Sequence, residues 1–222
     1  VVIKKEKDNI FYDLGKKYNT DKVVYHRYDR FYPLFLDYYR DKTFKLFEIG
    51  CGVDKSSFLM WHEYFSNASI FVMDITEEHQ TERGIVFKGD QSKIEDLEFA
   101  LEKVGKCDVI IDDGSHIPTH QINTFNELFP KMLNYGGVYI IEDIEASYWN
   151  PEKTLYGYKV GYENIVDYFS SYPHRINSEY CDLKNNFNIS SITFAHNCII
   201  IKKQTLEELE LTNREYRFKH ML

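Results

Sequence analysis

Acidic side chains recur along this chain at the points where short apolar runs end. The seven residues are Glu48, Asp74, Asp90, Asp112, Asp113, Glu142 and Asp143. Parallel strands present their carboxyl ends at one edge of a sheet, and open α/β sheets bind ligands at that edge. One acid at a strand end is often only a loop former or a helix cap. Seven acids at five successive ends indicate a binding site.

A glycine-rich turn, Glu48-Ile49-Gly50-Cys51-Gly52, follows the first of these apolar runs. Glycines in such a turn let a ligand approach the backbone closely. Asp74 lies 24 residues after Gly50, at the end of the next run, where a carboxylate can accept hydrogen bonds from a ribose diol. The two features together predict a ligand that contains adenosine, either NAD or S-adenosylmethionine.

Two details of the turn favour S-adenosylmethionine over NAD. The turn has no third glycine, since positions 55 and 56 hold Lys55 and Ser56. An acid, Glu48, precedes the first glycine, and its charge suits a cationic sulfonium better than a pyrophosphate. An NAD(P)-dependent oxidoreductase on the same type of sheet remains the second interpretation.

Apolar runs and helical periodicities alternate along most of the chain, which is typical of βα repeats. We expect parallel strands at residues 44–49, 69–75, 84–88, 107–111 and 138–141, with helices at 56–65, 93–104 and 119–133. The runs at 191–195 and 198–202 are close enough to form an antiparallel pair. The predicted fold is α/β, a Rossmann-like doubly wound sheet of seven strands, mostly parallel, with a C-terminal antiparallel pair.

One domain is expected over residues 1–222, because no linker, repeat or low-complexity segment interrupts the chain. Within it we expect an N-terminal segment over the cofactor (1–43), a core (44–203) and a C-terminal helix (204–222). The N-terminal segment shows no strong period apart from a candidate helix at 32–40. Gly136-Gly137 is expected to end the helix at 119–133, as glycines after helices do.

The motifs at these strand ends resemble those of a known enzyme family. Residues Phe47 to Gly52 resemble motif I of class I methyltransferases. The further motifs are Gly89-Asp90-Gln91-Ser92, Ile111-Asp112-Asp113-Gly114-Ser115-His116, Ile141-Glu142-Asp143-Ile144 and Ser147-Tyr148-Trp149. Together they resemble the metal-dependent sugar O-methyltransferases of macrolide tailoring, of the mycinamicin and tylosin type, and the related cephalosporin-biosynthesis group. The resemblance runs from about residue 18 to residue 202.

The N-terminal signature of that group, Tyr-Gly-Thr-Asp-Lys, resembles Tyr18-Asn19-Thr20-Asp21-Lys22 of this chain. Asn19 replaces the glycine of the signature. Asparagine tolerates positive φ angles better than most residues, so we expect the turn to be kept.

The resemblance implies S-adenosylmethionine as cofactor, a magnesium ion and a histidine base. By the matching motifs, Asp113, Glu142 and Asp143 are the implied metal ligands, and His116 is the implied catalytic base beside Asp113. The implied cofactor contacts are Thr20, Lys22, Glu48, Gly50, Gly52, Asp74, Ile75, Asp90, Gln91 and Asp112.

The chemistry of O-methylation agrees with these roles. An alcohol is a poor nucleophile while it keeps its proton, and a divalent ion lowers the pKa of a bound hydroxyl. Imidazole is the ordinary side-chain base near neutral pH, and Mg²⁺ takes a few carboxylates as ligands. The structural alternatives are that His116 caps the following helix and that Glu142 and Asp143 only bind loop backbone.

The acceptor implied by the family is a sugar hydroxyl. Tyr148 and Trp149 are candidates for a wall of the acceptor pocket, within a tyrosine-rich stretch at 148–175 that suits stacking on sugar rings. Since no large apolar wall is identifiable for a macrolide, the sequence favours a sugar, or a sugar nucleotide, of a surface polysaccharide. A non-catalytic domain that only binds the cofactor is the third interpretation, and the three acids with His116 count against it.

Composition excludes several partners. A formal net charge of −8 with scattered basic residues argues against nucleic acid, and no apolar run is long enough to predict a membrane partner. The four cysteines form no C-x-x-C pair, which argues against zinc ribbons and thioredoxin chemistry. We therefore expect a reducing, cytoplasmic environment, with the N-terminal aromatic residues as candidates for a homo-oligomer contact.

Overall fold

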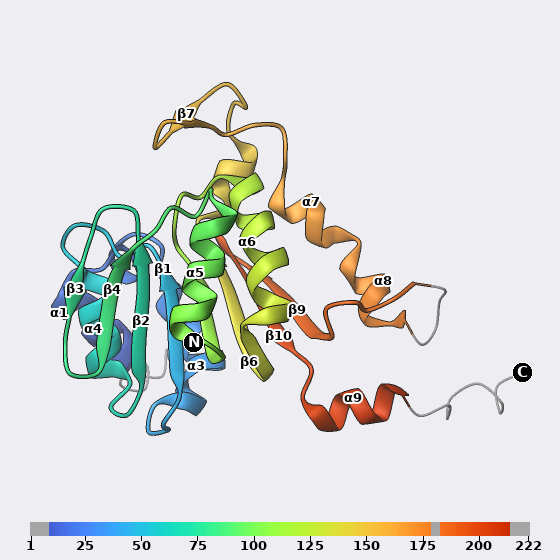
Figure 1. Cartoon of the computed structure of the whole chain (residues 1–222), viewed down its shortest axis with the longest axis horizontal. Helices are drawn as coiled ribbons and strands as arrows, with labels where there is room; N and C mark the ends of the chain where they lie inside the picture. The colour runs from blue at the N-terminus through green and yellow to red at the C-terminus, as the bar shows by residue number, and fades with distance from the viewer. Residues whose placement is uncertain (1–8, 179–182, 214–222) are drawn as a thin grey trace, which may run out of the picture.

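The protein is built on one open, mostly parallel sheet (Figure 1). The computed structural model describes residues 9–178 and 183–213. In sheet order, the eight strands of these residues are β3 (His79–Gln80), β4 (Gly84–Lys88), β2 (Ser69–Asp74), β1 (Lys45–Ile49), β5 (Cys107–Asp112), β6 (Leu133–Glu142), β10 (Cys198–Lys203) and β9 (Ile189–Ala195). Strands β4, β2, β1, β5 and β6 are parallel, and β10 is antiparallel to both β6 and β9. The predicted fold class is confirmed, and β3 adds a short antiparallel strand to one edge.

Helices cover both faces of the sheet, as the nearly continuous apolar strands require. Helix α4 (Ser56–Tyr64) packs on one face together with the N-terminal helices. Helices α5 (Ile94–Val104) and α6 (Pro118–Lys131) cover the other face (Figure 1). Successive strand residues point to opposite faces, so Leu46 belongs to the first core cluster and Phe47 to the second.

The N-terminal segment is more structured than its sequence indicates. Its elements are α1 (Ile10–Tyr18), α2 (Asp21–Val24), the 3-10 helix η1 (Tyr28–Arg30), α3 (Tyr32–Leu36) and the 3-10 helix η2 (Asp37–Tyr39). The side chain of Asn9 caps α1. Asn19 ends α1 with a φ of 54°, so the asparagine adopts the left-handed conformation expected at this turn.

A second set of elements follows β6 and lies beyond the carboxyl edge of the sheet or against α6. These are the 3-10 helix η3 (Ile144–Tyr148), a hairpin of β7 (Thr154–Leu155) and β8 (Tyr158–Lys159), α7 (Ile165–Ser170) and α8 (Tyr172–Ile176). Figure 1 shows the hairpin at the same end of the molecule as the loops that follow β1, β5 and β6.

One expectation about helix ends changes, and one is met within the described residues. Helix α6 ends at Lys131, and Gly136 and Gly137 lie inside β6, so the prediction that they end the helix is wrong. Gly136 has a φ of 76° at a point where the register between β5 and β6 shifts, so it bends a strand instead. The expected C-terminal helix is present as α9 (Leu206–Asn213), and the rest of that prediction lies outside the described residues.

No helix among the described residues combines the length and the apolar character that a membrane crossing needs.

Candidate active site

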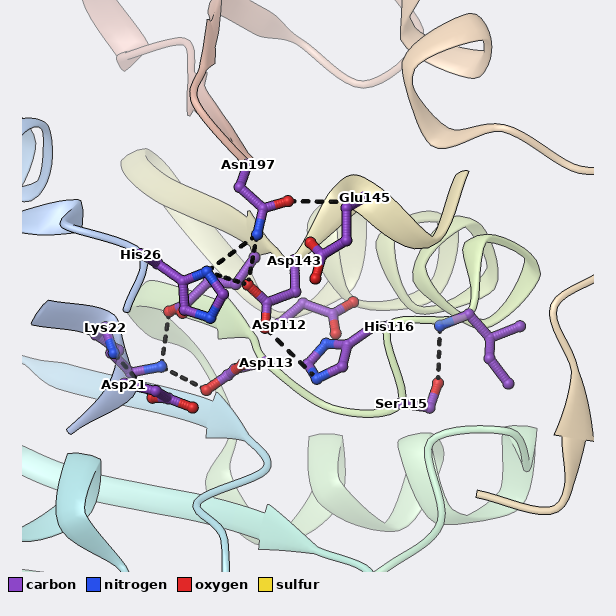
Figure 2. Close-up of polar contacts among 12 residues, drawn as sticks. Asp21, Lys22, His26, Asp112, Asp113, Ser115, His116, Asp143, Glu145 and Asn197 are labelled. Carbon is purple, nitrogen blue, oxygen red and sulfur yellow. Dashed lines mark hydrogen bonds and ion pairs between the residues drawn. The ribbon is translucent and has the colours of Figure 1, made fainter. Parts of the chain in front are cut away.

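Figure 2 shows Asp112, Asp113, His116 and Asp143 close together at the carboxyl edge of the sheet, beside Lys22 of the N-terminal segment. Asp112 and Asp113 end β5, Glu142 and Asp143 end β6, and β1 between β2 and β5 brings Glu48 to the same edge. The convergence follows from the parallel register, in which Ile49 lies opposite Asp112 and Asp112 lies opposite Ile141.

Lys22 of α2 enters this edge as a buried cation. Its side chain has 0% exposure, and Nζ lies 2.5 Å from Asp113 Oδ2, 2.8 Å from Glu142 Oε1 and 3.3 Å from Glu48 Oε1. Burial opposes the charged form, but the carboxylates of Asp113, Glu142 and Glu48 hold the pKa of Lys22 well above its ordinary value. Lys22 therefore remains an ammonium inside the site.

Glu48 and Glu142 are fixed by neutral donors as well as by Lys22. The hydroxyl of Ser57 donates to Glu48 Oε2 at 2.8 Å, and that of Tyr32 donates to Glu142 Oε1 at 2.5 Å. Burial raises the pKa of Glu48 to about 7, although Lys22 opposes the shift. Burial and the charge of Asp113 also raise the pKa of Glu142. Both carboxylates thus depend on their partners to stay ionised.

Asp143 is held from the opposite side. Its Oδ1 accepts hydrogen bonds from the Tyr28 hydroxyl at 2.7 Å and from Asn197 Nδ2 at 2.9 Å, and His26 Nδ1 lies 3.4 Å away. Its Oδ2 points toward His116 Nε2 at 3.7 Å, which is longer than a hydrogen bond (Figure 2). One oxygen of Asp143 is therefore engaged, and the other faces His116.

His116 does not cap α6, because the N-cap of that helix is Ile117. The φ of His116 is 60°, and Asp143 has a φ of 53°. Left-handed conformations of residues other than glycine cost free energy and cluster at functional sites. Its Nδ1 is buried and has no hydrogen-bond partner in the part of the chain that the structure describes, whereas Nδ1 of the neighbouring His120 lies 2.8 Å from the Ser115 hydroxyl.

Two groups of possible metal ligands arise here, and Asp113 belongs to both. Ligand atoms of Asp113, His116 and Asp143 all lie within 4.8 Å of one another, as do those of Glu48, Asp113 and Glu142. Mg²⁺ takes oxygen ligands and keeps several waters. The two carboxylates of the first group fit that ion, since the side chains of Asp113 and Asp143 retain 14% and 10% exposure.

A cavity of about 320 Å³ opens between the N-terminal segment and the glycine-rich turn. Its lining residues are Asn19, Asp21, Val24, Tyr25, Cys51, Gly52, Asp54, Ser56, Ser57 and Asp113. Its volume lies at the lower end of the range for small-molecule sites. Of the predicted cofactor contacts, Gly52 lines it directly.

Gly50 is required by packing. Its φ is 81°, and a Cβ atom there would lie 2.1 Å from the carbonyl oxygen of Asp113. A side chain at this position would push the turn away from the loop that carries Asp113. Gly50 thus sets the distance between the glycine-rich turn and the candidate metal ligands.

Asp74 holds the glycine-rich turn in place through hydrogen bonds to backbone amides. Its carboxylate accepts hydrogen bonds from the backbone amides of Cys51, Thr76 and Glu77. Burial opposes ionisation of Asp74, but these hydrogen bonds lower its pKa below the ordinary value. The next residue, Ile75, is exposed. The acid predicted to bind ribose also ties the end of β2 to the glycine-rich turn.

The remaining predicted contacts form a network under the loop of His116. Gln91 donates to Asp112 Oδ1 at 2.6 Å and accepts from the Ser115 amide at 2.9 Å. Asp90 accepts from the hydroxyl of Tyr158 at 3.0 Å. Burial raises the pKa of Asp112 to about 6, against the hydrogen bond from Gln91. These contacts join the loops after β4 and β5 to the β7–β8 hairpin.

The structure brings in two partners that the sequence did not single out, Tyr32 and Asn197, and it bonds Tyr158, a tyrosine of the stretch expected to stack on sugar rings, to Asp90. Tyr32 reaches Glu142 across 110 positions of sequence, and Asn197 reaches Asp143 across 54. Asn197 occupies the tight turn between β9 and β10 with a φ of 60°. That turn could have been found from the two neighbouring apolar runs, but nothing local indicates which way its side chain points.

The open sheet, its strand order and the acids at its carboxyl edge define the class I methyltransferase fold. No family model matches the chain. It is 34% identical over 144 residues to 8-demethyl-8-alpha-L-rhamnosyl tetracenomycin-C 2'-O-methyltransferase of Streptomyces olivaceus. The alignment covers 61% of this chain and 38% of that protein. It is also 34% identical over 146 residues to mycinamicin VI 2''-O-methyltransferase of Micromonospora griseorubida. That alignment covers 62% of this chain and 36% of the relative.

A solved structure of the methyltransferase MycE, in complex with Mg, SAH and mycinamycin VI, superposes with a TM-score of 0.76 at 26% identity. The match covers 88% of this chain and 53% of that one. This chain is thus related to the S-adenosylmethionine-dependent O-methyltransferases of macrolide and tetracenomycin sugars. The matched part amounts to well under half the length of the curated relatives.

Proposed function

We propose that the protein transfers a methyl group from S-adenosylmethionine to a hydroxyl of a sugar, with Mg²⁺ and with His116 as the base. The observation that carries this proposal is the convergence of Asp113, His116 and Asp143 beside the cavity at the sheet edge. The relatives support it, since their names describe methylation of sugar hydroxyls and MycE has been solved with Mg and SAH.

S-adenosylmethionine would bind in the cavity beside Gly52, under the N-terminal segment. We propose that Asp74, Asp90, Gln91 and Asp112 act mainly by holding the loops around the cofactor cavity in place. Each of them takes part in hydrogen bonds that join these loops. Thr20 and Glu48 are fully buried, so we propose that they support the residues that line the cavity and do not touch the cofactor themselves. Ile75 is exposed beside the turn, where an apolar side chain can cover a flat ring.

Magnesium would be held by Asp113 and Asp143, the two carboxylates that face His116. When bound, it supplies a positive charge that lowers the pKa of an acceptor hydroxyl and fixes its direction. Glu142 stays a predicted ligand, but its Oε1 already accepts from Lys22 and Tyr32. Because Mg²⁺ prefers oxygen ligands, the imidazole of His116 is left for another task.

That task is to take the proton of the acceptor hydroxyl. His116 Nε2 faces Asp143 Oδ2 across 3.7 Å, so the charge that the imidazole gains would lie beside a carboxylate. Figure 2 shows the ring of His116 directed toward Asp143. A positioned base of this kind contributes roughly 10²–10⁴-fold to a rate.

The acceptor would lie between His116 and the β7–β8 hairpin. The ring of Tyr156, at the tip of the hairpin, is 6.4 Å from the ring of His116, and the residue is 62% exposed. Tyr148 is exposed too, whereas the face of Trp149 is covered by Lys153 Nζ at 3.3 Å. We therefore place Tyr156 ahead of Tyr148 and Trp149 as the aromatic surface for a sugar ring.

We propose a glycoside of a small molecule as the acceptor class. The named relatives methylate sugars carried by tetracenomycin and mycinamicin. The polysaccharide acceptor that the sequence favoured has no support among them.

The proposal is tested by titrating the protein with S-adenosylhomocysteine in a calorimeter, with NAD in parallel. Micromolar binding of the first and none of the second is expected. Methyl transfer to rhamnosyl and deoxyhexosyl glycosides is then measured with Mg²⁺ and with a chelator. Binding of NAD alone, or full turnover in the chelator, would contradict the proposal.

A further inference from the structure

The candidate ligands form an inner and an outer group. The inner group is Glu48, Asp113 and Glu142, and the outer group is Asp113, His116 and Asp143. Each group has its ligand atoms close enough for one cation, and the two groups are joined by Asp113. Such an arrangement has the outline of a site for two ions with one bridging carboxylate.

The inner group already contains a cation. Lys22 Nζ lies within 3.3 Å of one oxygen from each of its three members, and its side chain is fully buried. The distances to Asp113 and Glu142, 2.5 and 2.8 Å, are those of charge-assisted hydrogen bonds. Figure 2 shows the ammonium directed at Asp113, on the side away from His116.

A divalent ion at the inner group would lie next to this ammonium. Two like charges at contact distance in a buried site repel each other strongly, and the Lys22 side chain is fully buried among its three carboxylate partners. The outer group meets this ammonium only through the shared Asp113, whereas the basic side chains that face its other carboxylate, Asp143, are the imidazoles of His116 and His26.

We propose that Lys22 is the built-in cation of the inner group, so that the protein binds a single divalent ion, at the outer group, with Asp113 shared between the ammonium and the ion. This inference rests on the proposed Mg²⁺ site. Lys22 is a positioning residue here, since it acts on the ion through Asp113.

The same contact couples the N-terminal segment to the metal. Lys22 belongs to α2, and its neighbours Asp21 and Val24 line the cavity. The ammonium therefore fixes that wall of the cavity to the carboxylate that the ion uses.

The test compares two isosteric changes, each in a member of one group only, and reads Mn²⁺ binding by electron paramagnetic resonance without acceptor or turnover. Glu48→Gln alters the inner group, and Asp143→Asn alters the outer group. We expect one Mn²⁺ per wild-type chain. The dissociation constant for Mn²⁺ should stay within threefold of the wild-type value in Glu48→Gln and should rise at least tenfold in Asp143→Asn. The reverse order, or two Mn²⁺ per wild-type chain, would overturn the proposal.

A second measurement removes the ammonium itself. Lys22→Ala should bind a second Mn²⁺, and its thermal unfolding temperature should rise with Mn²⁺ more than that of wild type. Lys17→Ala is the matched control, because Lys17 lies in the same segment and its ion pair with Glu63 is exposed. A folded Lys22→Ala protein that still binds one Mn²⁺ would refute the inference. If Lys22→Ala does not fold, the comparison of Glu48→Gln with Asp143→Asn still tests the proposal.

The proposed function is tested separately in the same preparations. Loss of S-adenosylhomocysteine binding would count against the methyltransferase proposal and leave the Mn²⁺ results standing. Failure of wild type to bind Mn²⁺ at millimolar concentration would end the single-ion proposal, whatever the cofactor result.

Discussion

At the scale of the residue, the site depends on side chains whose surroundings set both charge and direction. His116 and Asp143 share a left-handed backbone, which turns both side chains toward the same space. Among the described residues, the hydrogen bonds to the Asp143 carboxylate reach Oδ1 alone, and His116 Nδ1 has no partner. We propose that both groups are available to a ligand.

Replacing His116 with alanine should separate catalysis from cofactor binding. We expect turnover to fall by roughly 10²–10⁴-fold, because the acceptor proton loses its base. The affinity for S-adenosylhomocysteine should stay within about threefold, since His116 does not line the cavity. His62→Ala, on α4, is the control and should keep wild-type turnover. Equal loss of both properties in His116→Ala would make the residue structural.

Asp112 gives the protein a pH dependence of stability with a defined sign. Its pKa in the folded state is about 6, above the ordinary 3.8. Between these values the folded protein keeps a proton that the unfolded chain releases, so this group lowers stability as pH rises through the window. Above about pH 6 the full penalty applies.

Asp112→Asn should remove that penalty and still accept the hydrogen bond from Gln91. The variant should therefore gain stability over wild type as pH rises from 4 to 6, by up to a few kcal/mol, in line with a shift of about two units. Urea unfolding at several pH values, in a chelator, measures the difference. A difference that does not vary across this range would contradict the assigned cause.

At the scale of the element, the turn after β1 and the β7–β8 hairpin set the two sides of the site. Gly50 needs its lack of a side chain in order to pack on the Asp113 carbonyl. The hairpin tip holds Tyr156 and Gly157, both with positive φ, which is the geometry of a tight two-residue turn. Tyr158 anchors the hairpin to Asp90 and Ser92.

Gly50→Ala should be far more costly than Gly105→Ala, although both glycines have positive φ. An added Cβ at Gly105 meets nothing within 4 Å among the described residues, so only backbone strain, of about 1–3 kcal/mol, is expected there. At Gly50 the clash with Asp113 adds to that strain, and we expect a further loss of about 2 kcal/mol or more. Chemical denaturation of both variants measures the two costs, and equal costs would show that the close contact relaxes freely.

Tyr156→Ala should weaken acceptor binding more than it slows chemistry. A stacked aromatic side chain contributes to binding of the ring in ground and transition state alike, so the KM for the acceptor should rise about tenfold with kcat nearly unchanged. Tyr162→Ala is the matched control, because Tyr162 is 84% exposed and follows the β7–β8 hairpin instead of lying at its tip. An unchanged KM for Tyr156→Ala would place the acceptor elsewhere.

At the scale of the whole molecule, the N-terminal segment belongs to the core as much as to the site. Phe11, Tyr28, Tyr32 and Leu36 are buried in one cluster with Trp61 and with residues of β1, β2 and β5. The rings of Tyr28 and Tyr32 stack at 5.4 Å. A segment expected to cover the cofactor is also a structural layer on one face of the sheet.

Hydrogen exchange can distinguish a packed layer from a mobile cover. We expect amides of Tyr28 to Leu36 to be protected without cofactor, to within about tenfold of those in β5, because the segment is held by buried rings. Exchange followed by mass spectrometry, with and without S-adenosylhomocysteine, measures this. Rapid exchange that slows a hundredfold on adding the ligand would identify a true lid.

The sequence predicts most of the sheet and of the acidic edge because both rest on local patterns. Strands such as β5 are continuous apolar runs, and acids such as Asp113 follow them directly. The position of Lys22 could not be predicted in this way. Its partners lie 91 and 120 positions away, and only the docking of the N-terminal segment brings them together. The two-residue strand β3 is likewise too short to leave a period.

The ammonium of Lys22 also imposes an order of events when the chain is made. Lys22 is synthesised before one of its carboxylate partners, Glu142, which follows 120 residues later. At about 5–20 residues per second, this interval is roughly 6–24 s. During that time the lysine has no complete set of partners to be buried against. The pocket wall that carries it can therefore reach its final place only after β6 has been translated.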